Sequence, residues 1–385
     1  MLKFEDFIFE GFDTEHSLDT IRLTPHESQP DHIPGRAIDS TATPHVYGSE
    51  GISGANRRVS GMIQDKSQNK VYGWANSYSK QHLGRSMPTE HNGTPSSLEK
   101  QSAIGAAYHL AAQEHPEYQK RVFQAYQEQR PDIIKETGAH DYHSLLNASY
   151  SKMAEQTHKQ FDSIPLRSEY KDNEGYRNSN EMLRDVHLHN HITVYRGGQH
   201  ENLNHVDPQS GLTTNEKFRL VHDTFGHAIH GNAFGPQGEE TAWSTHSQMY
   251  TPAAQAAMSA ETRGQNSFVN YSKHNIDTQV KMRGLYHERK LASDAGQPTE
   301  HFDKALREAG SNWNYAPNKS VLLPPEMIHH EYNGHMPEYI KPLLKDIAGK
   351  PDHSTIRKMA EYHSGGTDET QTQKNEALIR SHYAA

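Results

Sequence analysis

Residues 214–231 carry apolar side chains at the spacing of an amphipathic helix, and this pattern constrains the fold more than any other. On a helical wheel Phe218, Val221, Phe225 and Ile229 fall in a single arc. Such an arc has to pack against other elements, because a lone apolar face is unstable in water. The segment therefore predicts one helix of a larger helical core.

The chain changes character at about residue 95. Residues 1–95 are rich in Gly, Pro, Ser, His and Asn, a composition typical of loops. Between residues 96 and 363 one segment after another repeats the helical spacing, and "ITVYR" (192–196) is the clearest strand. We therefore expect a mainly α protein with a few short strands. It would comprise a loop-rich N-terminal region (1–95), a mainly helical, metal-binding catalytic domain (96–363) and a polar C-terminal tail (364–385).

Composition excludes several function classes. The formal net charge of -9 argues against generic binding to nucleic acid, which needs a basic face. There are no cysteines, so any metal must take nitrogen and oxygen ligands. No apolar run reaches the length of a membrane span, and the N-terminus lacks the order of a secretory signal. We expect a protein of the host cytoplasm, or one packaged into a particle that is made there.

The polar side of the helix at 214–231 carries His222, Asp223, His227 and His230. Because the chain has 29 histidines, only their spacing and neighbours are informative. Asp223, His227 and His230 share one face at spacings of four and three. His222 and His227 are five residues apart, about 140° on a straight α-helix, and they converge only if the helix ends or contains a π-bulge. Both sets remain open as metal ligands.

Three glutamates downstream are candidates for a further ligand. Glu239 and Glu240 follow the helix closely, and Glu261 lies beside Arg263 in "AETRG". Two histidines and one carboxylate form the facial triad of mononuclear ferrous enzymes, which leaves positions open for oxygen and substrate. We expect ferrous iron, with zinc or manganese as alternatives. Asp223 or Glu240 would be the supporting carboxylate, and Arg263 would clamp a substrate or a carboxylate.

The element "HDTFGH" (222–227) resembles the H-E-L-L-G-H element of pterin-dependent aromatic amino acid hydroxylases. In that family two histidines five residues apart and a later glutamate bind iron, so the resemblance implies that His222, His227 and Glu261 are ligands. Asp223 stands where the family has glutamate, and the pterin-binding segment has no counterpart in this sequence. The resemblance therefore implies hydroxylation of a small aromatic or nucleobase-like substrate, without extending to the pterin.

A second resemblance leads to a hydrolase. The stretch "LVHDTFGHAIHG" is similar to the motif of HD-domain phosphohydrolases of the triphosphohydrolase branch. It implies that His222 and Asp223 are metal ligands and that the substrate is a nucleotide. The bound metal would acidify a water molecule, which then acts as the nucleophile.

A third resemblance covers a longer stretch. Residues from "EKQSAIGAAYHL" to "ETRGQNSFVNY" look like an uncharacterised group of proteins found in tailed phages and prophages. This resemblance implies a role in phage DNA metabolism, or packaging into the virion beside other particle proteins. In the second case the protein would be a non-enzymatic virion or accessory protein and would bind no metal.

Overall fold

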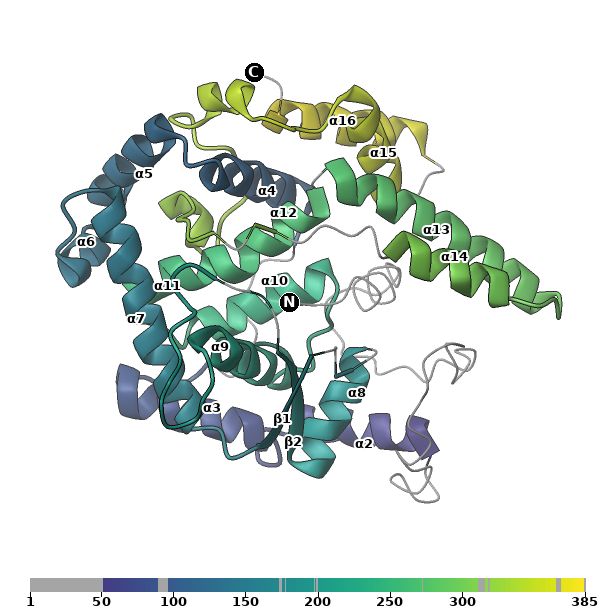
Figure 1. Cartoon of the computed structure of the whole chain (residues 1–385), viewed down its shortest axis with the longest axis horizontal. Coiled ribbons are helices and arrows are strands. Elements are labelled where there is room, and N and C mark those ends of the chain that lie inside the picture. The colour runs from purple at the N-terminus through teal and green to yellow at the C-terminus, as the bar shows by residue number, and fades with distance from the viewer. Residues whose placement is uncertain are drawn as a thin grey trace.

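The computed structural model describes residues 51–383, apart from 89–95, 173–174, 177, 197, 199, 272, 311–315, 318 and 365–367, and the described part is mainly helical (Figure 1). This confirms the predicted fold class. In chain order the α-helices and strands are α2 (Gly51–Gln64), α3 (Lys70–Leu83), α4 (Leu98–Ala112), α5 (Pro116–Gln129), α6 (Pro131–Thr137), α7 (Tyr142–Asp162), β1 (Arg167–Lys171), α8 (Ser179–Arg184), β2 (His191–Tyr195), α9 (Thr214–His222), α10 (Pro236–Ser247), α11 (Pro252–Ser259), α12 (Gln265–Tyr271), α13 (Lys273–Asp294), α14 (Glu300–Gly310), α15 (His353–His363) and α16 (Glu369–Tyr383).

Five short helical segments of other geometry complete the element list. Three are π-helices and continue an α-helix directly: η2 (Asp185–His189), η3 (Asp223–Ala228) and η4 (Ala260–Gly264). The other two are 3₁₀-helices, η5 (Pro325–Ile328) and η6 (Lys341–Asp346). Because π-helices are rare and concentrate at functional sites, η3 and η4 are candidate positions for such a site.

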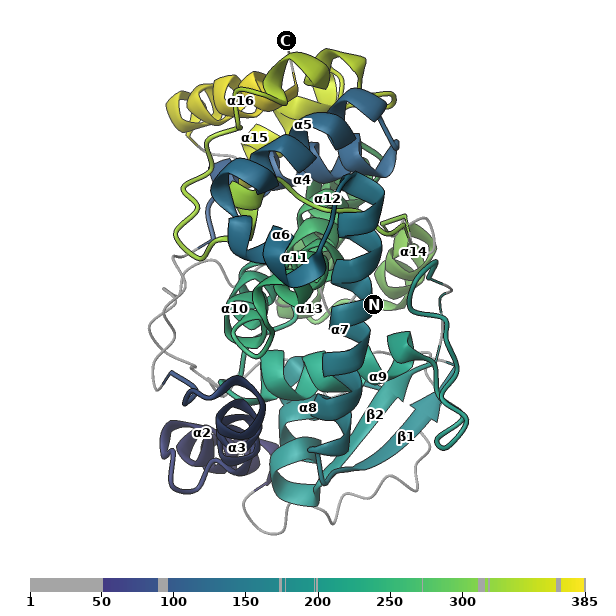
Figure 2. The same cartoon turned by 90° about the vertical axis from the view of Figure 1, so that its left-hand side faces the viewer.

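The only regular sheet in the described part of the chain is a parallel pair, β1 and β2, in register from Arg167 opposite His191 to Lys171 opposite Tyr195. β2 lies where "ITVYR" predicts a strand. α8 and η2 form the crossover that a parallel connection requires. The pair lies beside α9 at one end of the molecule, at the bottom of Figure 2.

The buried apolar side chains form two large clusters that meet at α9. One cluster joins α4, α5, α7, α11 and the C-terminal helices, and it contains Phe218 and Trp243. The other joins α2, α3, α8, β2 and η3, and it contains Val221 and Phe225. α7 runs along both clusters (Figure 2). The helix predicted from residues 214–231 therefore contributes side chains to both clusters.

Both ends of the described part contain helices that composition did not indicate. Within the region predicted to be loop-rich (1–95), residues 51–88 contain α2 and α3; the Asn69 side chain caps α3, and Gly84 ends it with positive φ. The polar tail predicted after residue 364 contains α16, whose Ile379 and Tyr383 are buried. In both cases burial against other helices stabilises a segment whose composition alone does not indicate a helix. Residues 1–50 and 89–95 lie outside the described part.

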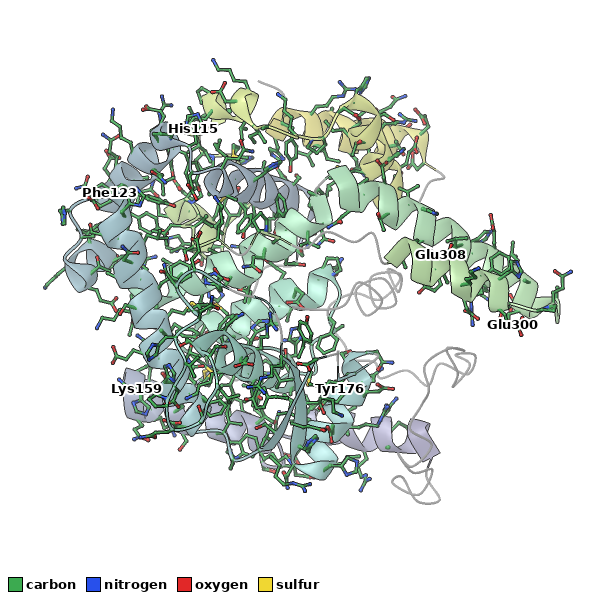
Figure 3. All side chains as sticks on the ribbon, viewed as in Figure 1. His115, Phe123, Lys159, Tyr176, Glu300 and Glu308 are labelled. Atoms are coloured by element: carbon green, nitrogen blue, oxygen red, sulfur yellow. The ribbon has the colours of Figure 1, made fainter. Side chains whose placement is uncertain are left out.

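A helical hairpin of α13 and α14 projects from the body. Glu300 and Glu308 lie on this arm, well away from the two large clusters (Figure 3). A small apolar cluster around Met282 and Leu306 holds the two helices together. Among the described residues, no helix is both long and apolar enough to cross a membrane.

Candidate metal centre

Local sequence explains why the central helix forms and where it changes geometry. Thr213 and Glu216 cap α9 reciprocally: the Thr213 hydroxyl accepts from the Glu216 backbone, and the Glu216 carboxylate accepts from the Thr213 backbone. The helix becomes π-helical directly after His222. The bond from the Ile229 amide to the Thr224 carbonyl, 3.1 Å long, is the i→i+5 bond of this geometry. A π-helical turn is one of the two conditions under which His222 and His227 were expected to converge.

His222, His227 and Glu239 bring their ligand atoms together. Each offers one atom, and these atoms all lie within 4.8 Å of one another. Nε2 of His222 is 3.5 Å from Oε2 of Glu239, and Nε2 of His227 is 3.3 Å from Oε1. All three residues are buried, with His227 completely inaccessible. Among the described residues this is the one group of three or more side chains with metal-ligand chemistry and spacing.

Three polar atoms at the centre of this group have no hydrogen-bond partner within the described part of the chain: Nε2 of His222, Nε2 of His227 and Oε1 of Glu239. The other nitrogen of each imidazole is engaged, that of His222 with Nδ1 of His246. Nδ1 of His227 is 3.1 Å from the Asn232 carbonyl, so this nitrogen carries the proton and Nε2 holds the lone pair of the neutral ring. Buried polar atoms are normally paired, so three unpaired atoms facing one another could hold a shared cation.

The distances fit ligands around an ion better than a direct ion pair. A charge-assisted N–H···O bond is about 2.7–2.9 Å long, shorter than either contact here. Two ligand atoms that are each about 2.1 Å from one metal, at angles between octahedral and tetrahedral, are about 3.0–3.4 Å apart. The observed separation of 3.3 Å lies within that range, the one of 3.5 Å lies just above it, and the three ligand atoms of the group lie within 4.8 Å of one another. A metal of ordinary bond length can therefore occupy the centre with small adjustments.

Electrostatics couples the His227 ring to the Glu239 carboxylate. Burial opposes charge on both groups, but each stabilises the charged form of the other. The pKa of His227 is raised to about 9 by Glu239, against the effect of burial. The pKa of Glu239 is lowered to about 2 by His227 and His222, again against burial. Without a metal, a proton held on His227 balances the carboxylate, and a divalent cation would replace it.

Close packing fixes the orientation of the two rings. A Cβ added to Gly226 would lie 3.0 Å from the His222 ring and 3.3 Å from Ala242. Glycine at this position therefore leaves room for the ring between η3 and α10. Phe234 packs edge-on against His227, with ring centroids 5.0 Å apart. The histidines are thus held in place before any metal arrives.

Asp223 is next to this group but is not part of it. The side chain is partly buried, and burial raises its pKa, while the nearby His227 and His222 act in the opposite direction. Asp223 and His230 do not join His227 in a three-residue group, so the alternative set of Asp223, His227 and His230 is not brought together.

Glu261, predicted as the third ligand, is engaged elsewhere, so the expectation needs correction. Its Oε1 accepts from the Tyr150 hydroxyl and, at 2.9 Å, from His200 Nε2, and its Oε2 accepts from Gln265 at 2.6 Å. Glu261 is therefore the centre of a separate buried network on η4. His200 and Tyr150 lie far from Glu261 in the sequence, and no local signal pairs them with it.

Glu240 and Arg263, predicted as supporting carboxylate and clamp, bind each other. The guanidinium donates through Nε and Nη2 to the two carboxylate oxygens, and through Nη1 to the carbonyls of Met327 and His329. The Cζ atom of Arg263 lies 3.9 Å from the centroid of the Trp243 ring. Because Arg263 is 0% exposed and donates four hydrogen bonds to these groups, its role here is to fix α10 against η4 and the loop at η5. Since Glu239 is adjacent to Glu240, this pair also fixes the backbone that carries the third side chain of the candidate metal centre.

The fold and the site together define a mainly helical protein with a buried group of two histidines and one glutamate. Comparison with family models, curated proteins and solved structures finds no match to this chain.

Proposed function

We propose that this protein is a mononuclear metalloenzyme that holds ferrous iron through His222, His227 and Glu239. The observation that carries the proposal is the convergence of three buried, unpaired ligand atoms in the described part of the chain. Two imidazoles and a carboxylate are the facial triad of non-haem iron oxygenases. When bound, the metal would supply activation of dioxygen for hydroxylation of a small aromatic or nucleobase-like molecule.

Three protein ligands favour a catalytic site over a structural one. Structural sites surround their metal with four protein ligands, whereas catalytic sites leave a position for water or substrate. Asp223 directly follows His222 in the sequence. Its carboxylate would accept hydrogen bonds from a substrate, whereas Glu240 is paired with Arg263.

A hydrolase is the second candidate, because two histidines and a glutamate also hold zinc in hydrolytic enzymes. The HD-type arrangement needs Asp223 as a ligand beside His222, and Asp223 stands outside the converging group. The hydrolytic candidate is therefore a site with the same three ligands, in which the metal acidifies a water molecule.

Metal analysis of protein purified without chelators tests the proposal. We expect about one metal per chain, and after reconstitution with ferrous iron under argon we expect oxygen consumption in the presence of aromatic or nucleobase compounds. Zinc or manganese together with hydrolysis of nucleotides would favour the hydrolase. If the reconstituted protein retains no metal while folding normally, both enzymes are excluded, and the non-enzymatic phage protein becomes the best remaining hypothesis.

A further inference from the structure

Beyond the three ligands, a hydrogen-bonded chain runs from His222 away from the metal position. Nδ1 of His222 is 3.2 Å from Nδ1 of His246, and Nε2 of His246 is 2.9 Å from Oε1 of Gln160. The Gln160 amide nitrogen donates to the Met249 carbonyl at 3.1 Å. His246 and Gln160 are both 0% exposed, so no solvent interrupts the chain.

The direction of each bond follows from its far end. A backbone carbonyl only accepts, so the Gln160 nitrogen faces Met249 and the Gln160 oxygen faces His246. That oxygen also only accepts, so Nε2 of His246 carries a proton. Within the described part of the chain, the contacts of His246 are Gln160, His222 and the rings of Phe218 and Tyr250, and none is a carboxylate. A neutral His246 therefore has its lone pair on Nδ1.

The same reasoning determines the state of His222. Since Nδ1 of His246 accepts, Nδ1 of His222 must donate. The lone pair of a neutral His222 ring is then on Nε2, the nitrogen that faces Glu239. Phe218 stacks on both imidazoles, with centroids 5.9 and 6.0 Å away, and holds the two rings in their relative orientation.

We propose that His246 and Gln160 are positioning residues that fix the tautomer of His222 and so present its Nε2 lone pair to the metal. This inference rests on the proposed metal site. Metal-bound histidines commonly donate a hydrogen bond from their second ring nitrogen to a carboxylate or a carbonyl. Here the acceptor would be the neutral imidazole of His246, which is itself held by the Gln160 amide. His246 and Gln160 are both uncharged in this arrangement and add no negative charge to the site. Glu239 therefore remains the anionic ligand that balances the metal.

Substitutions along the chain test this role through zinc affinity, measured by competition with a chromogenic chelator. His246→Phe removes the acceptor, and Gln160→Leu releases His246; each is expected to weaken zinc binding by roughly 10–100-fold. His246→Gln restores an acceptor oxygen and should recover most of the affinity. Thr245→Val is the matched control, because Thr245 lies on the same helix and its hydroxyl donates to the Thr241 carbonyl, away from the histidines.

A second measurement reads the tautomer directly, without a metal. In the nitrogen NMR spectrum of metal-free protein labelled at histidine, the signals lost in His222→Gln identify this ring. We expect them to show a protonated Nδ1 and a bare Nε2 in the unmodified protein, and a change of protonation pattern in His246→Phe. If His246→Phe merely destabilised the protein, its melting temperature would fall while the protonation pattern of His222 stayed the same.

The outcomes separate the two proposals. A proton on Nε2 of His222, or unchanged zinc affinity in a folded His246→Phe protein, overturns the positioning role and leaves the metal site intact. A complete lack of zinc binding by the unmodified protein overturns the proposed function and the positioning role with it.

Discussion

Nε2 of His227 lies 3.3 Å from Oε1 of Glu239, and neither atom has a hydrogen-bond partner among the described residues. Two electron-rich atoms held this close inside a protein need a positive charge between or upon them. In the metal-free protein that charge is a proton on His227, whose pKa Glu239 raises to about 9. In the proposed enzyme it is the metal.

The choice of Glu239 over Glu261 can be tested with a pair of isosteric substitutions. Glu239→Gln removes the anionic ligand and is expected to weaken metal binding by more than about 100-fold, beyond what loss of an outer partner costs. Glu261→Gln removes the negative charge of a carboxylate that accepts from His200 and Tyr150. Metal affinity should stay within about threefold, and the free energy of unfolding should fall by about 1–3 kcal/mol. Calorimetric titration of both variants with zinc provides the comparison, and the reverse order would restore Glu261 as the ligand.

Gly226→Ala is expected to disturb the metal site through packing alone. The new methyl group would lie 3.0 Å from the His222 ring, which has to move by a few tenths of an ångström. Overpacking of this kind costs about 1–3 kcal/mol, and metal affinity should fall with it. Gly284→Ala on α13 is the matched control: nothing lies within 4 Å of its added Cβ, and it should gain about 0.5–1 kcal/mol of helix stability. Urea unfolding of the metal-free proteins measures both, and equal effects of the two substitutions would contradict the packing argument.

Arg263→Met is expected to reduce stability strongly, because it leaves the buried carboxylate of Glu240 without its partner. Breaking a buried pair from one side costs about 3–5 kcal/mol. Arg263→Lys should recover only part of this, since one ammonium cannot span the carboxylate and the carbonyls of Met327 and His329. Removing the exposed Lys290–Asp294 pair by Lys290→Ala should change stability by about 0.5 kcal/mol or less. Denaturation midpoints rank these variants, and a small effect of Arg263→Met would show that the pair is dispensable.

The buried ring of His382 on α16 is expected to make the free energy of unfolding depend on pH. Burial lowers its pKa to about 4, and His335 and Lys341 act in the same direction. The unfolded chain therefore binds a proton near pH 6.5 while the folded protein does not. The free energy of unfolding should be unaffected above about pH 7 and should fall by about 3 kcal/mol between pH 6.5 and 4, since each pKa unit corresponds to about 1.4 kcal/mol.

The check is the difference in unfolding free energy between pH 7.5 and pH 5 for the unmodified protein and for His382→Gln. The glutamine does not titrate, and it retains a group that can bond to the Ser102 hydroxyl, the partner of His382 at 2.8 Å. The substituted protein should lose less stability on acidification. An identical pH dependence would assign the acid sensitivity to other groups.

The sequence by itself determined the central helix, the strand at 192–196 and the need for an irregular turn between His222 and His227. Each follows from local spacing: apolar residues three and four apart define a helix face, and two histidines five apart cannot meet on a straight α-helix. The structure contains all three features, with η3 as the irregular turn.

Only the tertiary structure decided which glutamate joins the histidines. Glu239, Glu240 and Glu261 carry the same chemistry and all follow the motif, so their roles depend on which helix faces which. α10 lies against η3 and places Glu239 at the histidines, while its neighbour Glu240 points to Arg263 and Glu261 points to His200. Adjacent residues on a helix differ by about 100° in direction, so one residue along α10 separates a candidate metal ligand from a structural ion pair. The polar segments at 51–88 and 369–383 became helices for a related reason: burial against distant parts of the chain, rather than local composition, stabilises them.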